Sequence, residues 1–318
     1  MSSSRPPTIE NNSNRTIKRQ MNGLFLHPDE ASEVNPTADR VRVTMLIGGD
    51  EYPQGVFLFS GWDRNVTSGG TIPAPTLHDQ NVILDQGVPA VWTNRPGTTV
   101  VSCIERLLDG LPLPYGWEIE DTDTRIAGAG QSWPAGTARS TILTETAALA
   151  GFYSGYFDNE GVLQYRTPSP TDEASEPDFD FDVNPEGIVA DSILISDDLL
   201  DAPNRYIVID TSSPETPRVG VYDVPDEAPQ SAQNRGYVIA RNYEVQGVTS
   251  TAQARAMAEA RYRADRGYEW ATVDSVIDPT FDTFQTVRLL GGIYRSQSWS
   301  MRCQPGGAMR HQLRRTYG

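Results

Sequence analysis

The chemistry open to this chain is limited first by its supply of lysine. Lys18 is the only lysine among 318 residues. A phosphate-binding loop of the form G-x-x-x-x-G-K-[ST] needs a lysine after its second glycine, and Lys18 does not stand in such a sequence. The sequence therefore argues against nucleotide hydrolysis.

A serine nucleophile and a zinc site are also weakly supported. The stretch GFYSG, residues 151–155, has the spacing G-x-x-S-G rather than G-x-S-x-G, and it follows a predicted helix instead of preceding one. No H-E-x-x-H pair is present, and the histidines are scattered: His27, His78 and His311. Surface or capping roles are the more frequent reading of such histidines, so we predict no catalytic and no metal-binding residue.

One acidic stretch comes closer to a known site. Asp180, Asp182, Asn184 and Asp191 occupy positions 1, 3, 5 and 12 of a calcium-loop pattern. Pro185, however, stands where the loop needs glycine, and Asp191 is shorter than the bidentate glutamate. We therefore predict a solvated acidic loop with no metal and no other cofactor. Pairs of carboxylates that could serve a glycoside hydrolase are plentiful, but spacing in sequence does not give their separation in space.

Charge and cysteine content limit the function classes further. The formal net charge is −16, and a nucleic-acid binder needs clustered lysine and arginine, so specific DNA binding is disfavoured. Cys103 and Cys303 form no C-x-x-C pair and are predicted to be buried free thiols. No run approaches the roughly 20 apolar residues of a membrane span. The polar first residues do not resemble a signal peptide, which predicts folding in a cytosol.

The elements expected to carry these residues fall into five segments. Residues 1–20, rich in serine, asparagine and proline, predict a flexible arm. Residues 21–97 read as a first β-rich domain with a hairpin over 41–61 and a further strand over 81–84. After residue 97 the apolar period changes from two to helical, and residues 98–170 predict an α+β unit. Its helices fall near 100–108 and 140–150, and its hairpin turns at 158–161.

The remaining two segments are an acidic connector over residues 171–187 and a second β-rich domain over residues 188–318. That domain contains a predicted helix over 250–266, with Ser250 as N-cap. Its apolar stripe is narrow: Ala254, Met257, Ala258 and Tyr262. The stripe predicts a helix lying on the surface of the sheet that contains the following strand, residues 269–277.

Several stretches, taken in order, resemble the tail-tip or baseplate hub proteins of long-tailed bacteriophages, often called minor tail proteins. They are EYPQGVFLFSG, SWPAGTAR, GFYSGYFDNEGVLQYR, DAPNRYIVID, RGYVIARNYEVQGVTSTAQARAMAEARYRADRG and VDSVIDPTF. The resemblance covers roughly residues 15–318. It departs from the family before the closing strand, where FDTFQTV replaces a Gly-Asp turn.

The resemblance implies a structural virion protein rather than an enzyme. It implies an α+β, β-rich fold in which two tube-type, β-barrel-like domains flank the middle unit, with the helix packed outside the second barrel. The implied assembly is a homotrimer at the tail tip, made in the host cytoplasm, with DNA passing through without specific binding. The implied partners are the distal tail protein, the tail tube and tape measure proteins, and tail fibre, spike or receptor-binding proteins.

A second hypothesis of another class stays open from the residues. A cell-wall glycoside hydrolase or carbohydrate-binding tail-tip protein could use the aromatic side chains of the middle unit, namely Trp117, Trp133, Tyr153 and Tyr156. Filling of the middle unit's core is the commoner role for such residues.

The basic residues at the end of the chain lead to a further expectation. Residues 288–318 carry six arginines and no acid in an otherwise acidic protein. We expect these arginines to lie against acidic surface on a neighbouring subunit and to steer assembly.

Overall fold

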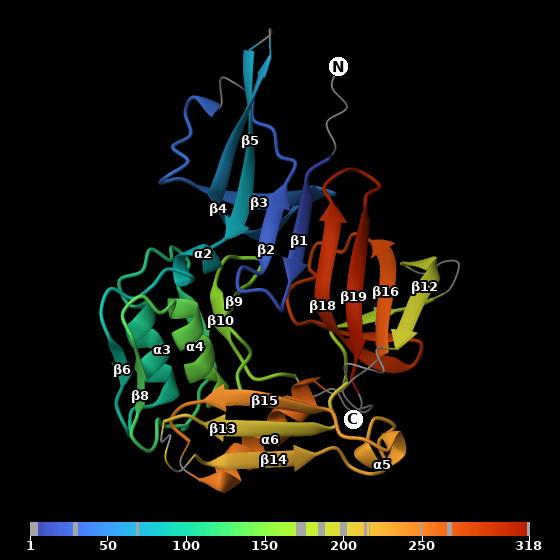
Figure 1. Cartoon of the computed structure of the whole chain (residues 1–318). Helices are drawn as coiled ribbons and strands as arrows, with labels where there is room; N and C mark the ends of the chain where they lie inside the picture. Colours follow the sequence, from blue (N-terminus) through green and yellow to red (C-terminus); the bar gives the residue numbers. More distant parts are fainter. Residues whose placement is uncertain are drawn as a thin grey trace.

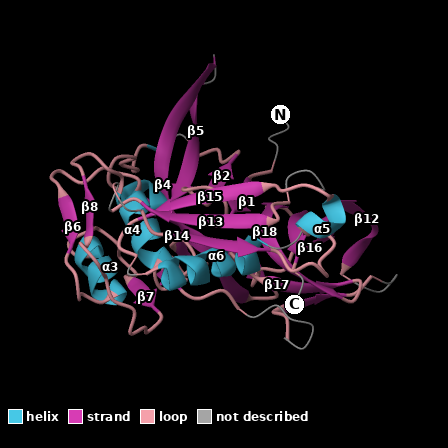
Figure 2. Ribbon diagram, turned by 60° about the horizontal axis from the view of Figure 1, so that its bottom comes forward, coloured by secondary structure: helices cyan, strands magenta, loops and turns pink. Residues whose placement is uncertain are grey.

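The computed structural model describes residues 6–27, 31–67, 70–169, 176–183, 188–197, 202–212, 215, 217–248, 250–265 and 269–316. Strands predominate and helices are few (Figures 1 and 2), so the predicted β-rich α+β class is confirmed. None of the sheets in the described part closes on itself. No helix among these residues is long and apolar enough to cross a membrane.

One large sheet runs through both β-rich parts of the chain. Its strands lie in the order β12 (Val189–Asp197), β16 (Glu269–Val276), β19 (Ala308–Arg315), β18 (Gly292–Arg302), β1 (Thr8–Asn12), β2 (Arg19–Asn22), β5 (Gly70–Asp79), β4 (Asp50–Thr67) and β3 (Arg40–Ile47). Two further strands extend it beside β18, namely β17 (Thr286–Leu289) and β11 (Phe179–Phe181). The amino-terminal and carboxy-terminal strands therefore share one hydrogen-bonded surface.

The join between the two halves is β1, and it corrects the prediction of a flexible arm over residues 1–20 for the part from residue 6 onward, since residues 1–5 lie outside the described part. Strand β1 pairs antiparallel with β18 on one side and with β2 on the other. Ile9 is fully buried, and the Asn11 amide donates to the Thr283 hydroxyl at 2.7 Å. The polar composition suggested disorder, but these polar groups find buried partners far along the chain.

Strands β4 and β5 form a long hairpin, called the arm, that projects from the body (Figure 1), and β3 pairs with the first part of β4. The predicted hairpin over residues 41–61 is confirmed, with Gly48 and Gly49 at its turn. The hairpin of β4 and β5 extends further, to Thr67 paired with Gly70. The predicted strand over 81–84 is wrong. A short helix, α2 (Asn81–Leu84), begins there because the Asp79 carboxylate accepts from the Asn81 backbone N–H at 3.0 Å and turns the chain.

The middle unit is built around two helices, α3 (Val100–Leu108) and α4 (Arg139–Ala148), both close to their predicted positions. The apolar face of α3 and the buried residues of α4 enter one core. Two short sheets surround them. One pairs β6 (Trp92–Asn94) with β8 (Gln131–Trp133), and the other consists of β7 (Trp117–Ile119), β10 (Leu163–Tyr165) and β9 (Tyr156–Phe157). Strands β9 and β10 form the predicted hairpin around residues 158–161.

A separate small unit is inserted between the paired strands β12 and β16. It consists of β13 (Arg205–Asp210), β14 (Val219–Asp223), α5 (Ala232–Arg235), β15 (Ala240–Val245) and α6 (Thr251–Asp265). Strand β13 pairs antiparallel with β14 and parallel with β15. Helix α6 runs along this sheet (Figure 2).

The position of α6 corrects the expectation that it would lie on the sheet of residues 269–277, outside the second domain. Ser250 caps it as predicted, accepting from the Gln253 N–H at 3.1 Å. Ala254, Ala258 and Tyr262 are buried, but against β13 and β14. A Cβ placed on Gly220 of β14 would lie 2.1 Å from the Ala254 carbonyl carbon, so glycine allows the helix backbone to rest on the strand.

Candidate functional site

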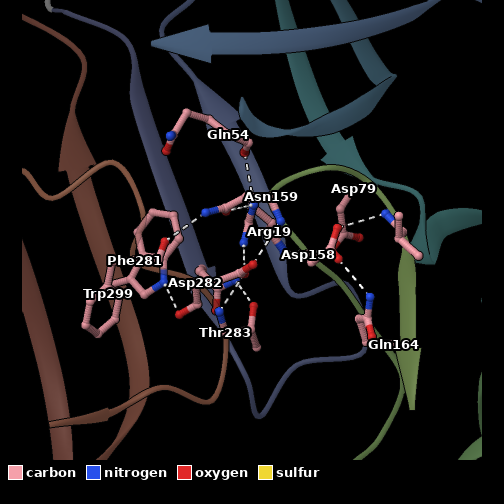
Figure 3. Close-up of polar contacts among 12 residues, drawn as sticks. Arg19, Gln54, Asp79, Asp158, Asn159, Gln164, Phe281, Asp282, Thr283 and Trp299 are labelled. Carbon is pink, nitrogen blue, oxygen red and sulfur yellow. Dashed lines mark hydrogen bonds and ion pairs between the residues drawn. The ribbon is translucent and has the colours of Figure 1, made fainter. Parts of the chain in front are cut away.

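The most elaborate constellation of polar side chains lies inside the molecule, at Arg19 (Figure 3). Arg19 stands at the start of β2 and is 1% exposed. Its guanidinium donates to the Gln54 carbonyl at 3.0 Å and to the Asn159 side-chain oxygen at 2.7 Å. It also forms an ion pair with Asp282 at 2.6 Å. Arg19 therefore ties β2 to β4, to the β9–β10 turn and to the loop before β17.

Asp282 is held from a second side by the middle unit. Its other carboxylate oxygen accepts from the Asn159 backbone N–H at 2.9 Å, and the Asn159 amide donates to the Phe281 carbonyl at 3.2 Å. The Arg19 guanidinium also lies 5.3 Å from the Trp299 ring. We call Arg19, Gln54, Asn159, Asp282 and Trp299 the Arg19 junction. It joins the two halves of the large sheet and the middle unit at one buried point.

The turn that carries Asn159 reaches the junction because glycine allows a close approach. Gly161 has φ +89°, and a Cβ there would lie 2.7 Å from a methyl carbon of Val56 in β4. The Gln80 side chain donates to the Gly161 carbonyl at 3.0 Å. The hairpin turn of the middle unit therefore packs directly against strand β4.

Two carboxylates flank the junction, Asp79 buried and Asp158 half-buried. Asp79 accepts hydrogen bonds from the Arg19 N–H at 2.9 Å and from Asn81, while Asp158 accepts from Gln164 at 2.8 Å. Burial raises the pKa of Asp79 and the pKa of Asp158, and the hydrogen bonds that they accept oppose that rise. Both groups serve as acceptors for buried N–H donors.

The only lysine forms a second cross-link nearby. The Lys18 ammonium donates to the carbonyls of Ser13 and Arg15 and, at 2.9 Å, to the Ser154 hydroxyl. Burial lowers the pKa of Lys18 to about 8, so the protonated form predominates at neutral pH. A serine next to a lysine is one pattern of a nucleophile and its base. Here the charged amine holds the β1–β2 turn against the GFYSG segment instead.

Ser275 and His311 form another pair of potentially reactive groups. Their Oγ and Nε2 atoms lie 2.9 Å apart, but the residues are 6% and 1% exposed. The His311 ring packs edge-on against Phe181 and Phe281, and burial lowers its pKa to about 4. The pair lies in the core, where no substrate reaches it.

The residues singled out in the sequence do not converge. His27, His78 and His311 lie on different elements, and no group of three metal-ligating side chains gathers among the described residues. Asp180 pairs with Arg288 at 3.4 Å, whereas Asn184 lies outside the described part. Cys103 and Cys303 are free thiols, the first buried and the second partly buried.

The aromatic residues of the carbohydrate hypothesis are mostly core residues. Trp133 is 4% exposed and donates to the Glu145 carboxylate at 2.7 Å, and Tyr156 is 7% exposed. Trp117 packs against the middle core. Tyr153 stacks on Phe284 with ring centroids 3.9 Å apart. These four rings form no shared exposed platform.

Three of the six carboxy-terminal arginines, Arg288, Arg310 and Arg315, pair with acids of their own chain, and the expectation that these arginines meet acidic surface on a neighbouring subunit stays a prediction. Arg310 makes two hydrogen bonds of 2.7 Å to Asp274 across the β16–β19 pair. Arg315 pairs with Glu269 at 3.0 Å. Antiparallel pairing places these opposite charges side by side. The partners are far apart in sequence, so the sequence alone did not indicate the pairs.

Exposed apolar side chains gather at the two open edges of the large sheet. Leu46 on edge strand β3 is 70% exposed, and Leu194 on edge strand β12 is 65% exposed. Val66, near the tip of the arm, is 78% exposed. Unpaired edges and exposed apolar groups of this kind mark surfaces for association.

No family model and no curated protein matches the sequence. Solved structures match its fold over nearly the whole chain. The tail protein from Neisseria meningitidis MC58 has a TM-score of 0.68 at 11% identity, covering 99% of this chain and 95% of that chain. The 43 kDa tail protein of prophage MuSo2 from Shewanella oneidensis has a TM-score of 0.60 at 14% identity, covering 98% of this chain and 94% of that chain. Prophage tail protein gp18 from Listeria monocytogenes EGD-e has a TM-score of 0.55 at 11% identity, covering 98% of this chain and 88% of that chain.

The chain has the fold of phage tail proteins. This confirms the fold-level resemblance drawn from its sequence.

Proposed function

We propose that the protein is a structural component of a phage tail that acts as a hub at the tail tip. The observation that carries the proposal is the fold match to solved tail proteins over nearly the full length of the chain. In this proposal, residues 21–97 and 188–318 supply the two tube-type domains, and the middle unit, residues 98–170, supports them. Three copies form a ring around a DNA conduit, and the acidic residues repel DNA along its wall.

The open sheet edges support the proposed ring. Strand β3 ends the large sheet on one side and β12 ends it on the other, and both expose leucine. Edge strands can pair with another chain through their free N–H and C=O groups. Neighbouring copies in the ring would then cover these edges, and the distal tail protein, tail tube, tape measure and fibre or spike proteins would bind above and below.

The test is the oligomeric state of the purified protein together with particle imaging. We expect a threefold ring from the parent chain and from Leu290→Arg, which places arginine at a site that is 64% exposed away from both edges. Leu46→Arg and Leu194→Arg should yield monomers that still fold. A monomeric parent, or edge variants that assemble normally, would contradict the proposal.

The proposal also makes the protein a non-enzyme. Purified protein incubated with host cell envelope should release neither sugar nor peptide fragments. Release that is absent from a heat-denatured sample would instead support the glycoside hydrolase hypothesis.

A further inference from the structure

A large cleft lies where the inserted unit faces the rest of the molecule. Its volume is about 1340 Å³. Its walls come from the β1–β2 turn, from α4 and the segment that follows it, from α6, and from β18 and β19 (Figure 1). Segments far apart in sequence therefore meet around one space.

The cleft collects positive charge in an acidic protein. Its basic lining residues are Arg15, Lys18, Arg261, Arg263, Arg295 and Arg314. Glu145 is the only acid among the described residues that line it. The whole chain carries a formal net charge of −16, so this concentration of cations runs against the composition of the protein.

Two of these cations, Arg15 and Arg261, have no ion-pair partner among the described residues. The Arg261 guanidinium lies over the Tyr243 ring at 5.0 Å, and all three hydrogen bonds of Lys18 go to uncharged oxygens. Arg263, in contrast, pairs with Glu259 on the same helix.

Apolar surface accompanies the charge. The stacked rings of Tyr153 and Phe284 line the cleft, together with Leu149, Phe152 and Met257. A segment bound there would meet both cations and apolar side chains. A peptide supplies both kinds of group, because apolar side chains can stand between its carboxylates.

We propose that this cleft binds an extended, carboxylate-rich segment of a partner protein. The complementarity of charge argues for an acidic ligand, and complementary charge chiefly steers encounter and fixes register. A peptide is favoured over single-stranded DNA because the acidic chain around the cleft repels a long polyanion, whereas a short segment enters between α4 and α6. The inference concerns a partner segment and does not rest on the trimeric ring.

Binding would also stiffen the molecule. The inserted unit meets the middle unit through contacts such as the Gln131 amide to the Gln246 carbonyl at 3.4 Å. A ligand that touched both Arg15 on the β1–β2 turn and Arg261 on α6 would bridge the two sides of the cleft. The bound segment would thus fix the inserted unit against the large sheet.

The experiment measures fluorescence anisotropy of a short labelled peptide of alternating glutamate and leucine with the whole chain. Matched probes replace every glutamate with glutamine, or replace the peptide with a labelled single-stranded oligonucleotide. We expect the acidic peptide to bind and to weaken as salt rises, and the glutamine peptide not to bind. The variant Arg15→Gln/Arg261→Gln should reduce the affinity about tenfold.

The matched control is Arg64→Gln/Arg95→Gln, which removes the same charge at exposed positions outside the cleft lining. It should keep the parent affinity, and both double variants should keep the parent melting temperature. Equal weakening by both variants, tighter binding of the oligonucleotide, or no binding of the acidic peptide would each overturn the proposal.

A further variant tests whether the chain's own acidic residues, rather than a partner, occupy the cleft. Residues 171–176 include Asp172, Glu173 and Glu176, and Ser169 before them lies at the cleft. If Asp172→Asn/Glu173→Gln/Glu176→Gln binds the peptide with parent affinity, the site serves a partner. A gain of about tenfold or more would show that the chain's own acidic segment is the occupant, and the proposal would fail.

Discussion

Helix α6 and strand β2 are joined to their neighbours in two different ways. The α6 contact is apolar and depends on small residues, because Gly220 lets the helix backbone approach β14 beside Ala254. The Arg19 junction is polar and depends on one long side chain that reaches three separate segments. Small residues allow one element to rest on another, whereas a buried cation fixes several elements at once and requires every partner to be present.

The largest effect that separates the two kinds of contact should follow Arg19→Ala. This change leaves Asp282, whose side chain is 14% exposed, without its cation, and we expect a loss of about 3–5 kcal/mol in the free energy of unfolding. Denaturant unfolding measures it. The control is Arg42→Ala, which breaks an exposed pair with Glu160 and should cost about 0.2–1 kcal/mol. Equal losses would mean that the junction is no stronger than a surface ion pair.

The apolar contact should be broken by adding a single methyl group. Gly220→Ala forces the backbone of α6 away from β14, and we expect a loss of about 1–3 kcal/mol, as for other overpacked cores. Gly61→Ala is the control, since its added Cβ would stay 3.5 Å from the nearest atom of Thr76. A parent-like melting temperature for Gly220→Ala would show that α6 does not rest on the strand as closely as described.

Acid should act on the core next to the junction through His311. The pKa of His311 is about 4 in the folded chain, below the 6.5 of a free histidine. Between these two pH values the unfolded chain therefore binds a proton at His311 that the folded chain does not bind. Stability from this group is therefore present above pH 6.5 and is lost as the pH falls toward 4. Between pH 7 and pH 5 we expect a loss of about 2 kcal/mol.

The measurement is the difference in unfolding free energy between the parent chain and His311→Gln across this pH range. The difference cancels the opposite contribution of Asp79 and Asp158, whose raised pKa values favour the folded chain in acid. His78→Gln, on β5, is the control for loss of a histidine elsewhere in the chain. An unchanged profile for His311→Gln would place the acid sensitivity elsewhere.

The smallest effect should come from an ion pair on helix α6. Arg263→Gln removes the i, i+4 pair with Glu259, in which the arginine side chain is 68% exposed, and should cost no more than about 0.5 kcal/mol. Thermal unfolding measures it, with Glu259→Gln as the matched change. A loss as large as that of Gly220→Ala would mean that the Arg263–Glu259 pair stabilises α6 as much as its packing on β14 does.

Local features of the chain were predictable where the cause is itself local. The helix stripe and the Ser250 cap located α6, and the glycine pair located the turn between β3 and β4. The partner of α6 was not predictable, because its narrow stripe fits any sheet with a small residue in the right place. The sequence neighbour, residues 269–277, was the natural candidate, but Gly220 lay on a strand that sequence proximity did not suggest.

The candidate site was beyond prediction for the same reason. Polar residues such as Lys18 and Arg19 read as an exposed arm, since nothing nearby in sequence could satisfy them. The carboxy-terminal arginines have no acid near them in sequence, and only strand pairing shows that Arg310 lies beside Asp274.

The sequence by itself determined the β-rich class, the positions of α3, α4 and α6, the lack of a phosphate-binding loop, and a fold-level resemblance to phage tail proteins. These depend on period, turn residues and residue order, which act over a few positions of the chain. Only the tertiary structure decided that β1 joins both halves of one sheet, that Arg19 is buried, and that basic side chains from four segments line one cleft. These depend on contacts between residues up to hundreds of positions apart, and the free energy of a buried charge is set by such partners rather than by its neighbours in sequence.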